Sequence, residues 1–234
     1  MDIRKHIIKE ERSLPVFLLL DVSGSMHGEK IEAVNIALKD MINSFKKIED
    51  AKGAIKLCLI TFGGNSVNII KELSAIKDDD VYTLTANGNT PMASAFEMVS
   101  NLIEDYNVIS SRDYSPTIVL ISDGNPTDMR EYRSGMTVED ILNIECVKKL
   151  HTGARTIKAT KLAMGIGADQ DINILKAFIN NNSIPVIKYT DTSTIERFFN
   201  WVTMSISTRS VSNNPNQVSF DDVTDTFDDE EIEF

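Results

Sequence analysis

Two kinds of hydrophobic pattern alternate along the chain. Residues 15–22 (PVFLLLDV) form an almost unbroken apolar run, which is typical of a strand buried on both faces of a sheet. From Glu29 to Glu49 the apolar residues instead recur every three or four positions, which predicts an amphipathic helix with one face on the core. The same alternation predicts further strands at 54–63, 66–73, 115–124, 158–167 and 185–189. It predicts further helices at 88–106, 138–150, 172–179 and 193–207.

The order of these elements predicts the fold class. Strands that alternate with helices of this length need crossover connections, and such connections make the strands parallel. We therefore predict one α/β domain with a doubly wound, mostly parallel sheet and helices on both faces. In such a sheet, ligands bind beyond the carboxyl ends of the strands. Asp21 and Asp123 both follow the apolar residues of a predicted strand, so we expect them at that edge.

Charge is unevenly distributed along the 234 residues. The formal net charge is −11, but residues 213–234 contain eight acids and no Lys or Arg, which leaves −3 for the rest. We expect an N-terminal extension at 1–13, the domain at 14–209, and an acidic, flexible tail at 210–234. No basic stripe is present, so nucleic-acid binding is not expected.

The sequence also bears on the cellular compartment. No apolar run approaches the length that spans a bilayer, and the charged start MDIRKHIIKEER lacks the apolar block of a signal peptide. Cys58 and Cys146 lie inside apolar segments, which indicates buried thiols in a reducing compartment rather than a disulfide. We therefore expect a cytoplasmic protein with no membrane partner.

Small oxygen-bearing side chains gather in three loops at the predicted ligand-binding edge, namely 21–25, 88–90 and 122–124. Oxygen ligands rich in hydroxyls favour Mg²⁺, with Mn²⁺ as the alternative, and the scarcity of Cys and His argues against zinc. If neutral hydroxyls are the main direct ligands, the ion keeps much of its charge and one open position. A carboxylate from another protein is then the natural sixth ligand.

The same residues carry a family resemblance. The pattern Asp-x-Ser-x-Ser is present as Asp21, Ser23 and Ser25, and Thr90 and Asp123 follow further along the chain. In these residues the chain resembles a von Willebrand factor A-type domain, whose metal-ion-dependent adhesion site uses this arrangement. The resemblance implies a doubly wound fold and metal-dependent protein binding without catalysis.

The resemblance extends from about Leu14 to Arg209 and narrows to one branch. The stretches FLLLDVSGSMHGEKIEAVN, GNTPM, VLISDGNPTD and FFNWVTMSIS are similar to the bacterial TerY-like branch. Its members are often encoded beside tellurite-resistance genes, protein kinases and PP2C-type phosphatases. This implies an adaptor in a stress-response module, with a Ser/Thr kinase or a PP2C-type phosphatase as partner. Asn89 stands where the family commonly has a second glycine, and Asn tolerates the left-handed backbone angles that glycine would adopt.

Each loop also has a simpler interpretation. Asp21 with its serines resembles a polar turn, and Thr90 before a proline is a good helix N-cap. Asp123 before a glycine is a common turn pair, and Asp128 either lines the rim of the site or caps the segment that follows it. His27 is interpreted as a rim residue. The combination of three loops, more than any one of them, favours the metal site.

A rival function is a Mg²⁺-dependent phosphoester hydrolase or phosphotransferase that uses the same pocket. It needs a nucleophile or a base, and the sequence places neither beside Asp21. Ser23 stands where aspartyl phosphatases have the aspartate that acts as general acid. The segment GSMHGEK (24–30) departs from the spacing of a phosphate-binding P-loop. We therefore do not expect an enzyme.

The acidic tail leaves three interpretations open. It is a solubilising segment, or one of its acids, such as Asp221 or Glu233, occupies the metal site of its own or a neighbouring copy. In the third interpretation a partner kinase phosphorylates Ser219, Thr224 or Thr226.

Overall fold

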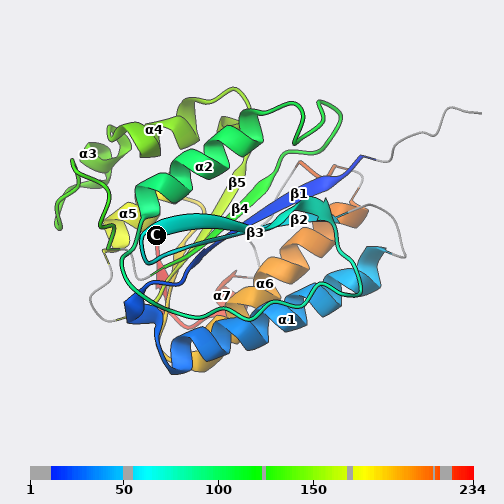
Figure 1. Cartoon of the computed structure of the whole chain (residues 1–234), viewed down its shortest axis with the longest axis horizontal. Helices are drawn as coiled ribbons and strands as arrows, with labels where there is room; N and C mark the ends of the chain where they lie inside the picture. The colour runs from blue at the N-terminus through cyan, green and yellow to red at the C-terminus, as the bar shows by residue number, and fades with distance from the viewer. Residues whose placement is uncertain (1–11, 50–54, 123–124, 168–170, 213, 217–222) are drawn as a thin grey trace, which may run out of the picture.

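The computed structural model describes residues 12–49, 55–122, 125–167, 171–212, 214–216 and 223–234. Within these residues seven strands form one sheet in the order β3-β2-β1-β4-β5-β6-β7 (Figure 1). The strands are β1 (Leu14–Asp21), β2 (Ile55–Gly63), β3 (Ser66–Ala75), β4 (Thr117–Ser122), β5 (Thr160–Gly165), β6 (Val186–Lys188) and β7 (Ile232–Glu233). Strands β1, β2, β4, β5 and β6 run parallel, whereas β3 and β7 pair antiparallel at the two edges.

Helices cover both faces of this sheet (Figure 1). On one face lie α2 (Met92–Glu104), α3 (Val138–Leu142), α4 (Glu145–Thr152) and α5 (Ile172–Ile179). On the other face lie α1 (Glu29–Glu49), α6 (Thr192–Val211) and the short α7 (Val223–Thr226). Two 3-10 turns, η2 (Gly24–Met26) and η3 (Thr156–Lys158), complete the described elements. The predicted doubly wound, mostly parallel α/β fold is confirmed.

The buried core explains the apolar runs in the sequence. Every residue of β1 is buried, because helices cover both of its faces. The aromatic residues Phe198, Phe199 and Trp201 of α6 are also buried, as expected of a core helix. Cys58 and Cys146 are buried free thiols, and desolvation raises the pKa of each to about 12. Both thiols are therefore poor nucleophiles at neutral pH.

Two predicted helices differ from those observed. The segment 138–150 is divided into α3 and α4, because Ile144 adopts an extended backbone while its side chain stays in the core. The helix predicted from residue 88 begins only at Met92, since residues 87–90 are used in contacts with neighbouring loops. Local apolar spacing does not report either effect.

The C-terminal segment differs from the predicted flexible tail. Residues 223–234 pack on the domain, with Val223 and Phe227 each only 3% exposed. The ring of Phe227 lies edge-on to Trp201 at 6.1 Å between centroids, and β7 extends the sheet beside β6. The prediction of a flexible tail is therefore wrong for residues 223–234, because apolar residues among the acids give the segment a face that the domain can bury. Asp221 and Ser219 lie outside the described residues.

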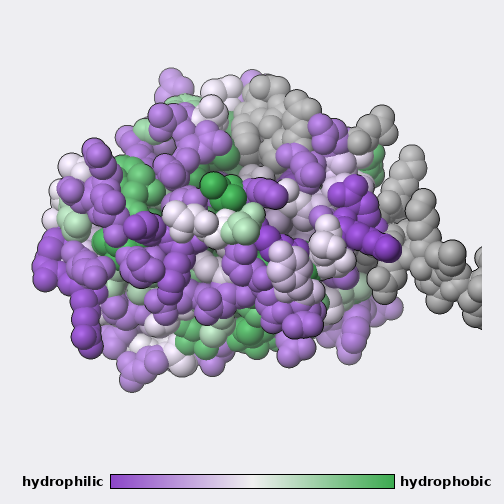
Figure 2. All heavy atoms as spheres, turned by 90° about the horizontal axis from the view of Figure 1, so that it is seen from above, coloured by the Kyte–Doolittle hydropathy of each residue, from purple (hydrophilic) through white to green (hydrophobic). Residues whose placement is uncertain are grey.

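One face of the domain is largely polar. The face seen in Figure 2 is mostly hydrophilic, and its apolar side chains lie in small separate groups. Among the helices of the described ranges, none is both long and apolar enough to cross a membrane.

Candidate functional site

Asp21 is the last residue of β1 and is only 1% exposed. Its Oδ1 accepts a hydrogen bond from the Ser23 amide at 2.8 Å, and its Oδ2 accepts one from the Ser122 hydroxyl at 2.6 Å. Ser122 ends β4, the parallel neighbour of β1, so the pairing of two central strands brings the two side chains together. The carboxylate is thus fixed in orientation at the C-terminal edge of the sheet.

Ser23 and Ser25 present their hydroxyls side by side. The Oγ atoms are 3.1 Å apart, and the tight turn η2 holds the two residues at this distance. Ser23 is buried, whereas Ser25 is exposed. Neighbouring ligands of an octahedral Mg²⁺ ion at its usual bond length would lie about 2.9 Å apart. The separation of the two hydroxyls therefore fits a shared magnesium ion.

Glycine contacts bring the Thr90 loop to this edge. The Gly24 amide donates to the Gly88 carbonyl at 2.9 Å, and the Gly64 amide donates to the Asn87 carbonyl at 2.8 Å. Gly88 has a φ of +64°, and a Cβ added there would lie 2.5 Å from the Gly64 Cα. This close approach requires glycine at position 88.

Thr90 lies beside these contacts and is 5% exposed. Its amide donates to the Thr127 hydroxyl at 3.1 Å, and its carbonyl accepts from the Thr127 amide at 3.0 Å. The main chain of Thr90, in the loop that follows β3, is thus bound to Thr127 in the loop that follows β4.

Asp128 performs the capping role that the sequence suggested for Thr90. Its carboxylate accepts from the amides of Ala93 and Ser94, both at 2.9 Å, and from the Ser94 hydroxyl at 2.7 Å. Among the described contacts, no amide in the first turn of α2 donates a hydrogen bond to the Thr90 hydroxyl. The helix cap therefore does not occupy that oxygen. Asp128 is 35 residues from Ala93 in the chain, and no local pattern could have revealed the contact.

Replacing Asp128 with alanine is expected to lower the free energy of unfolding by about 1–2 kcal/mol, the usual cost of losing a helix cap. Asp128→Asn should recover part of that loss, because it keeps one acceptor oxygen. Urea denaturation would measure both variants. A loss below about 0.3 kcal/mol for Asp128→Ala would contradict the capping role.

The fifth predicted residue, Asp123, lies outside the described residues. Its neighbour Ser122 is bonded to Asp21, so β4 ends at the same edge as β1. The structure therefore brings the loop 21–25 and the loop 87–90 together, and it places the end of β4 beside Asp21. The sequence did not assign Ser122 the role of orienting Asp21.

The surroundings of the edge are poor in metal-binding side chains of the usual kind. Within the described ranges, no group of three or more His, Cys, Asp or Glu residues could hold a metal ion. The Lys30 ammonium donates to the Ser25 carbonyl at 3.3 Å, which places one positive charge at the rim. His27 is exposed, in line with its predicted place on the rim. A cation at this edge would therefore depend on hydroxyls and the fixed aspartate.

The last acids of the chain are bound elsewhere. Glu233 pairs with Lys176 at 3.0 Å and with Lys188 at 3.3 Å. Glu231 pairs with Arg197 at 2.5 Å. Neither carboxylate is available to a metal ion in this arrangement, and Asp221 lies outside the described residues.

A doubly wound sheet with aspartate and hydroxyl side chains at its C-terminal edge defines a class of α/β ligand-binding domains. Residues 16–125 match the family model described as the von Willebrand factor type A domain, and this segment includes all five predicted site residues. This segment of the chain is therefore similar to the von Willebrand factor type A family.

Solved structures support the same fold. A von Willebrand factor type A protein from Catenulispora acidiphila is 17% identical with a TM-score of 0.63, over 83% of this chain and 42% of that chain. The pilus adhesin SpaC from Lactobacillus rhamnosus GG is 14% identical with a TM-score of 0.66, over 86% and 31%. The von Willebrand domain of the pili tip protein Mfa5 from Porphyromonas gingivalis is 10% identical with a TM-score of 0.64, over 87% and 98%.

These identities are low, so the likenesses show the fold alone. The chain spans less than half the length of the first two structures. A search of curated proteins found no match. The narrower resemblance to the TerY-like branch is not supported by these matches.

Proposed function

We propose that the edge formed by Asp21, Ser23, Ser25, Thr90 and Asp123 binds Mg²⁺, or alternatively Mn²⁺, and offers it to a carboxylate of a partner protein. The observation that carries the proposal is the pair of serine hydroxyls 3.1 Å apart beside a buried, fixed aspartate. This is a site for protein–protein interaction and has no catalytic role.

The donor chemistry supports a site that recruits a carboxylate. Both oxygens of Asp21 already accept hydrogen bonds from the protein, so part of their charge is used locally. Ser23 and Ser25 are neutral ligands that would leave the ion electrophilic. The rim cation Lys30 would further attract a carboxylate and repel a basic partner. When bound, the ion would supply the positive charge that a partner's Asp or Glu completes.

The solved structures add support of a general kind. Two of them are described as a pilus adhesin and the domain of a pili tip protein. Together with the family match, these descriptions favour an interaction module over an enzyme for this chain.

The rival proposal, a Mg²⁺-dependent phosphoester hydrolase or phosphotransferase, needs a nucleophile or a general base near Asp21. The Ser23 amide and the Ser122 hydroxyl both donate to Asp21, and neither group is a base. Turnover of a generic phosphoester that disappears in Asp21→Ala would favour this rival.

A narrower proposal concerns the cellular setting. The similarity of four sequence stretches to the TerY-like branch supports an adaptor role in a bacterial, cytoplasmic stress module, such as tellurite resistance. The partner would be a Ser/Thr kinase or a PP2C-type phosphatase that contributes the acid. Capture of such a partner from the cognate operon, with and without a chelator, would test this setting.

Titration of Mg²⁺, and separately of Mn²⁺, is expected to raise the melting temperature of the full chain. A ligand at one hundred times its dissociation constant stabilises a folded protein by about 2.7 kcal/mol, which is about 5–10 °C for a chain of this size. Ser25→Ala should shift the required ion concentration at least tenfold, because it removes one ligand from an exposed position.

Ser111→Ala is the matched control, since Ser111 is also exposed and lies far from the site in sequence. It should respond to both ions like the wild type. Equal responses of Ser25→Ala and the wild type would contradict the assigned ligand. The absence of any response to either ion in the wild type would contradict the metal site itself.

A further inference from the structure

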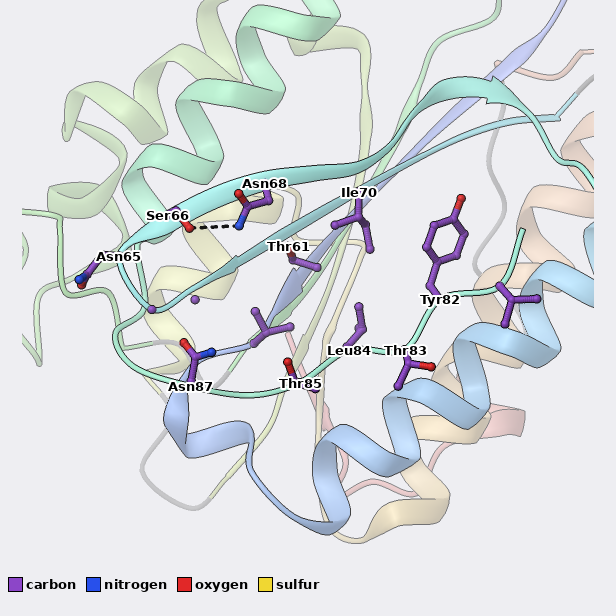
Figure 3. Close-up of a pocket in the computed structure, with 14 residues that line it drawn as sticks. Thr61, Asn65, Ser66, Asn68, Ile70, Tyr82, Thr83, Leu84, Thr85 and Asn87 are labelled. Atoms are coloured by element: carbon purple, nitrogen blue, oxygen red, sulfur yellow. Dashed lines mark hydrogen bonds between the residues drawn. The ribbon is translucent and has the colours of Figure 1, made fainter. Parts of the chain in front are cut away.

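A strap of seven residues, 81–87, begins after the turn that follows β3 (Figure 3). It leads toward the loops 21–25 and 87–90, which we call the metal loops. It is extended but belongs to no described strand or helix. Its burial alternates, with Tyr82, Leu84 and Ala86 facing inward and the odd-numbered residues exposed. This period of two is the pattern of a β-strand with one face on the core. The strap is therefore a strand-like segment that pairs with no strand in the part of the chain that the structure describes.

The first anchor of the strap is an ion pair at its start. Lys71 of β3 and Asp80 are 2.9 Å apart, with side chains only 5% and 10% exposed. The Tyr82 hydroxyl donates to Asp80 at 2.7 Å. Burial by itself raises the pKa of Asp80, but hydrogen bonds from the Lys77 amide, Lys71 and Tyr82 outweigh it and lower that pKa below its usual value. The anchor is thus charged and rigid at neutral pH.

Two further anchors hold the middle and the end. The Asn35 side chain on α1 accepts from the Leu84 amide at 2.7 Å and donates to the Leu84 carbonyl at 3.0 Å. The Asn87 amide donates to the Val22 carbonyl, and its carbonyl accepts from the Gly64 amide, both at 2.8 Å. The strap is therefore held in one conformation before any ligand binds.

These anchors determine where the remaining main-chain groups point. In an extended chain the N–H and C=O groups of successive residues face opposite sides. Those of Leu84 face α1, so those of Thr83 and Thr85 face the other way, toward the side on which Asn87 meets Val22. Neither Thr83 nor Thr85 makes a main-chain hydrogen bond with any residue of the described ranges. Their donors and acceptors are thus open to a ligand.

A groove of about 450 Å³ lies on this side of the strap. Figure 3 shows Asn68 and Ile70 of β3 above it and the strap residues below it. Its lining consists of apolar, glycine and uncharged polar residues, among them Thr61, Asn65, Asn68, Ile70, Thr83 and Thr85. None of these residues carries a charge, although a quarter of the chain is Asp, Glu, Lys or Arg. The groove suits a neutral ligand that forms hydrogen bonds.

The groove is continuous with the metal edge. Val22 and Asn87 line it, and the residues that follow them, Ser23 and Gly88, belong to the two metal loops. The Gly24 amide joins these loops through its bond to the Gly88 carbonyl. A ligand that fills the groove therefore ends beside the hydroxyl pair.

We propose that the groove binds an extended segment of the partner protein whose acid reaches the metal ion, an inference that rests on the proposed function. The partner's main chain pairs with Thr83 and Thr85, as an added strand does. Its side chains in the groove are neutral, and its Asp or Glu follows at the end beside Val22. Thr85 and Gly88 are three residues apart, about 10 Å along an extended chain, so the acid lies about three residues beyond the paired position.

The test uses a phage-displayed library of decapeptides with one fixed Asp, selected on the full-length protein in Mg²⁺. We expect enrichment of peptides with a run of uncharged residues at a constant distance from the Asp. Thr85→Pro removes one main-chain donor and should weaken the selected peptide about tenfold, the loss expected for one hydrogen bond. The Mg²⁺-induced rise in melting temperature of the Thr85→Pro variant should equal that of the wild type.

Asp78→Pro is the matched control. Asp78 lies outside the groove, in the turn closed by the Asp80 amide and the Lys77 carbonyl, where proline is favoured. It should bind the peptide like the wild type. Ile70→Arg is a second variant that introduces a charge into the groove from a residue that is already 36% exposed, and it should also weaken the peptide.

The outcomes separate the two proposals. If the melting temperature responds to Mg²⁺ but no peptide is enriched, the groove proposal is overturned and the metal site stands. The same holds if a selected peptide binds Thr85→Pro and Ile70→Arg as tightly as the wild type, or if the groove binds a neutral glycan in place of peptides. If the wild type does not respond to either ion, the proposed function itself fails.

Discussion

Replacing Glu231 with glutamine is expected to lower the free energy of unfolding at pH 7 by about 2–3 kcal/mol. Glu231 is 1% exposed, and its two oxygens accept from Arg197 at 2.5 and 2.8 Å. The hydroxyls of Thr190 and Thr194 donate to it at 2.8 and 2.9 Å, and the Asp228 amide donates at 3.0 Å. Glutamine keeps the shape of the buried side chain but leaves the Arg197 guanidinium without its partner charge. We expect a loss below the usual range of about 3–5 kcal/mol for a broken buried pair, because the Arg197 side chain is 34% exposed.

The loss should depend on pH in a defined direction. Burial by itself raises the pKa of Glu231, but hydrogen bonds from Arg197, the Asp228 amide and the two threonines outweigh it and lower the pKa to about 2. A carboxylate with a lowered pKa stabilises the fold above its ordinary pKa of 4.5, and this contribution disappears as the pH falls toward about 2. The difference between wild type and Glu231→Gln should therefore be constant above pH 6 and shrink below pH 4.5.

Urea denaturation at several pH values between 7 and 3 would measure this difference. Glu230→Gln is the matched control, because Glu230 is the adjacent acid and is exposed. It should change the free energy of unfolding by no more than about 0.5 kcal/mol. If both variants behave alike, or if the difference does not change with pH, the described ion pair does not stabilise the folded protein.

Replacing Gly88 with alanine is expected to lower the free energy of unfolding by about 3 kcal/mol or more and to abolish the response to Mg²⁺. The added Cβ would meet the Gly64 Cα at 2.5 Å, and main-chain atoms at this distance can relax only if the two loops separate. Separation would break the hydrogen bond from the Gly24 amide to the Gly88 carbonyl. Thr90 would then move away from the serine pair.

Gly135→Ala separates the effect of backbone angle from that of contact. Gly135 has a φ of +85°, comparable to the +64° of Gly88, but an added Cβ there would meet no atom within 4 Å. Gly135→Ala should lower the free energy of unfolding by about 1 kcal/mol and leave the response to Mg²⁺ intact. Urea denaturation and melting temperature with and without Mg²⁺ would compare the two variants. Equal losses would mean that the two loops do not meet as described.

Much of the fold could be predicted from local patterns. The apolar run of β1 reflects burial on both faces of a strand, and the three-to-four spacing of α1 reflects burial on one face of a helix. Each pattern repeats along its element, so it is visible in the local sequence. The C-terminal segment was missed because its apolar residues are few and lie among acids. Val223 and Phe227 become buried only because the chain folds back onto the domain, where Phe227 contacts Trp201 of α6.

The candidate site was predicted in part. The spacing of Asp21, Ser23 and Ser25 within one turn is visible in the sequence, because a short loop brings near neighbours together whatever the rest of the chain does. The contact of Asp21 with Ser122 joins residues 101 positions apart, and that of Asp128 with Ala93 joins residues 35 apart. The local spacing of apolar residues cannot predict such long-range pairs.

The sequence by itself determined the order of strands and helices, the parallel sheet, and the residue types at its C-terminal edge. The tertiary structure decided which side chains hold those residues in place, that residues 223–234 complete the sheet, and that the strap 81–87 forms an uncharged groove beside the candidate site. The physical reason is the range of the interactions. Burial patterns repeat within one element and can be read locally, whereas an ion pair, a cap or a groove exists only where distant segments meet.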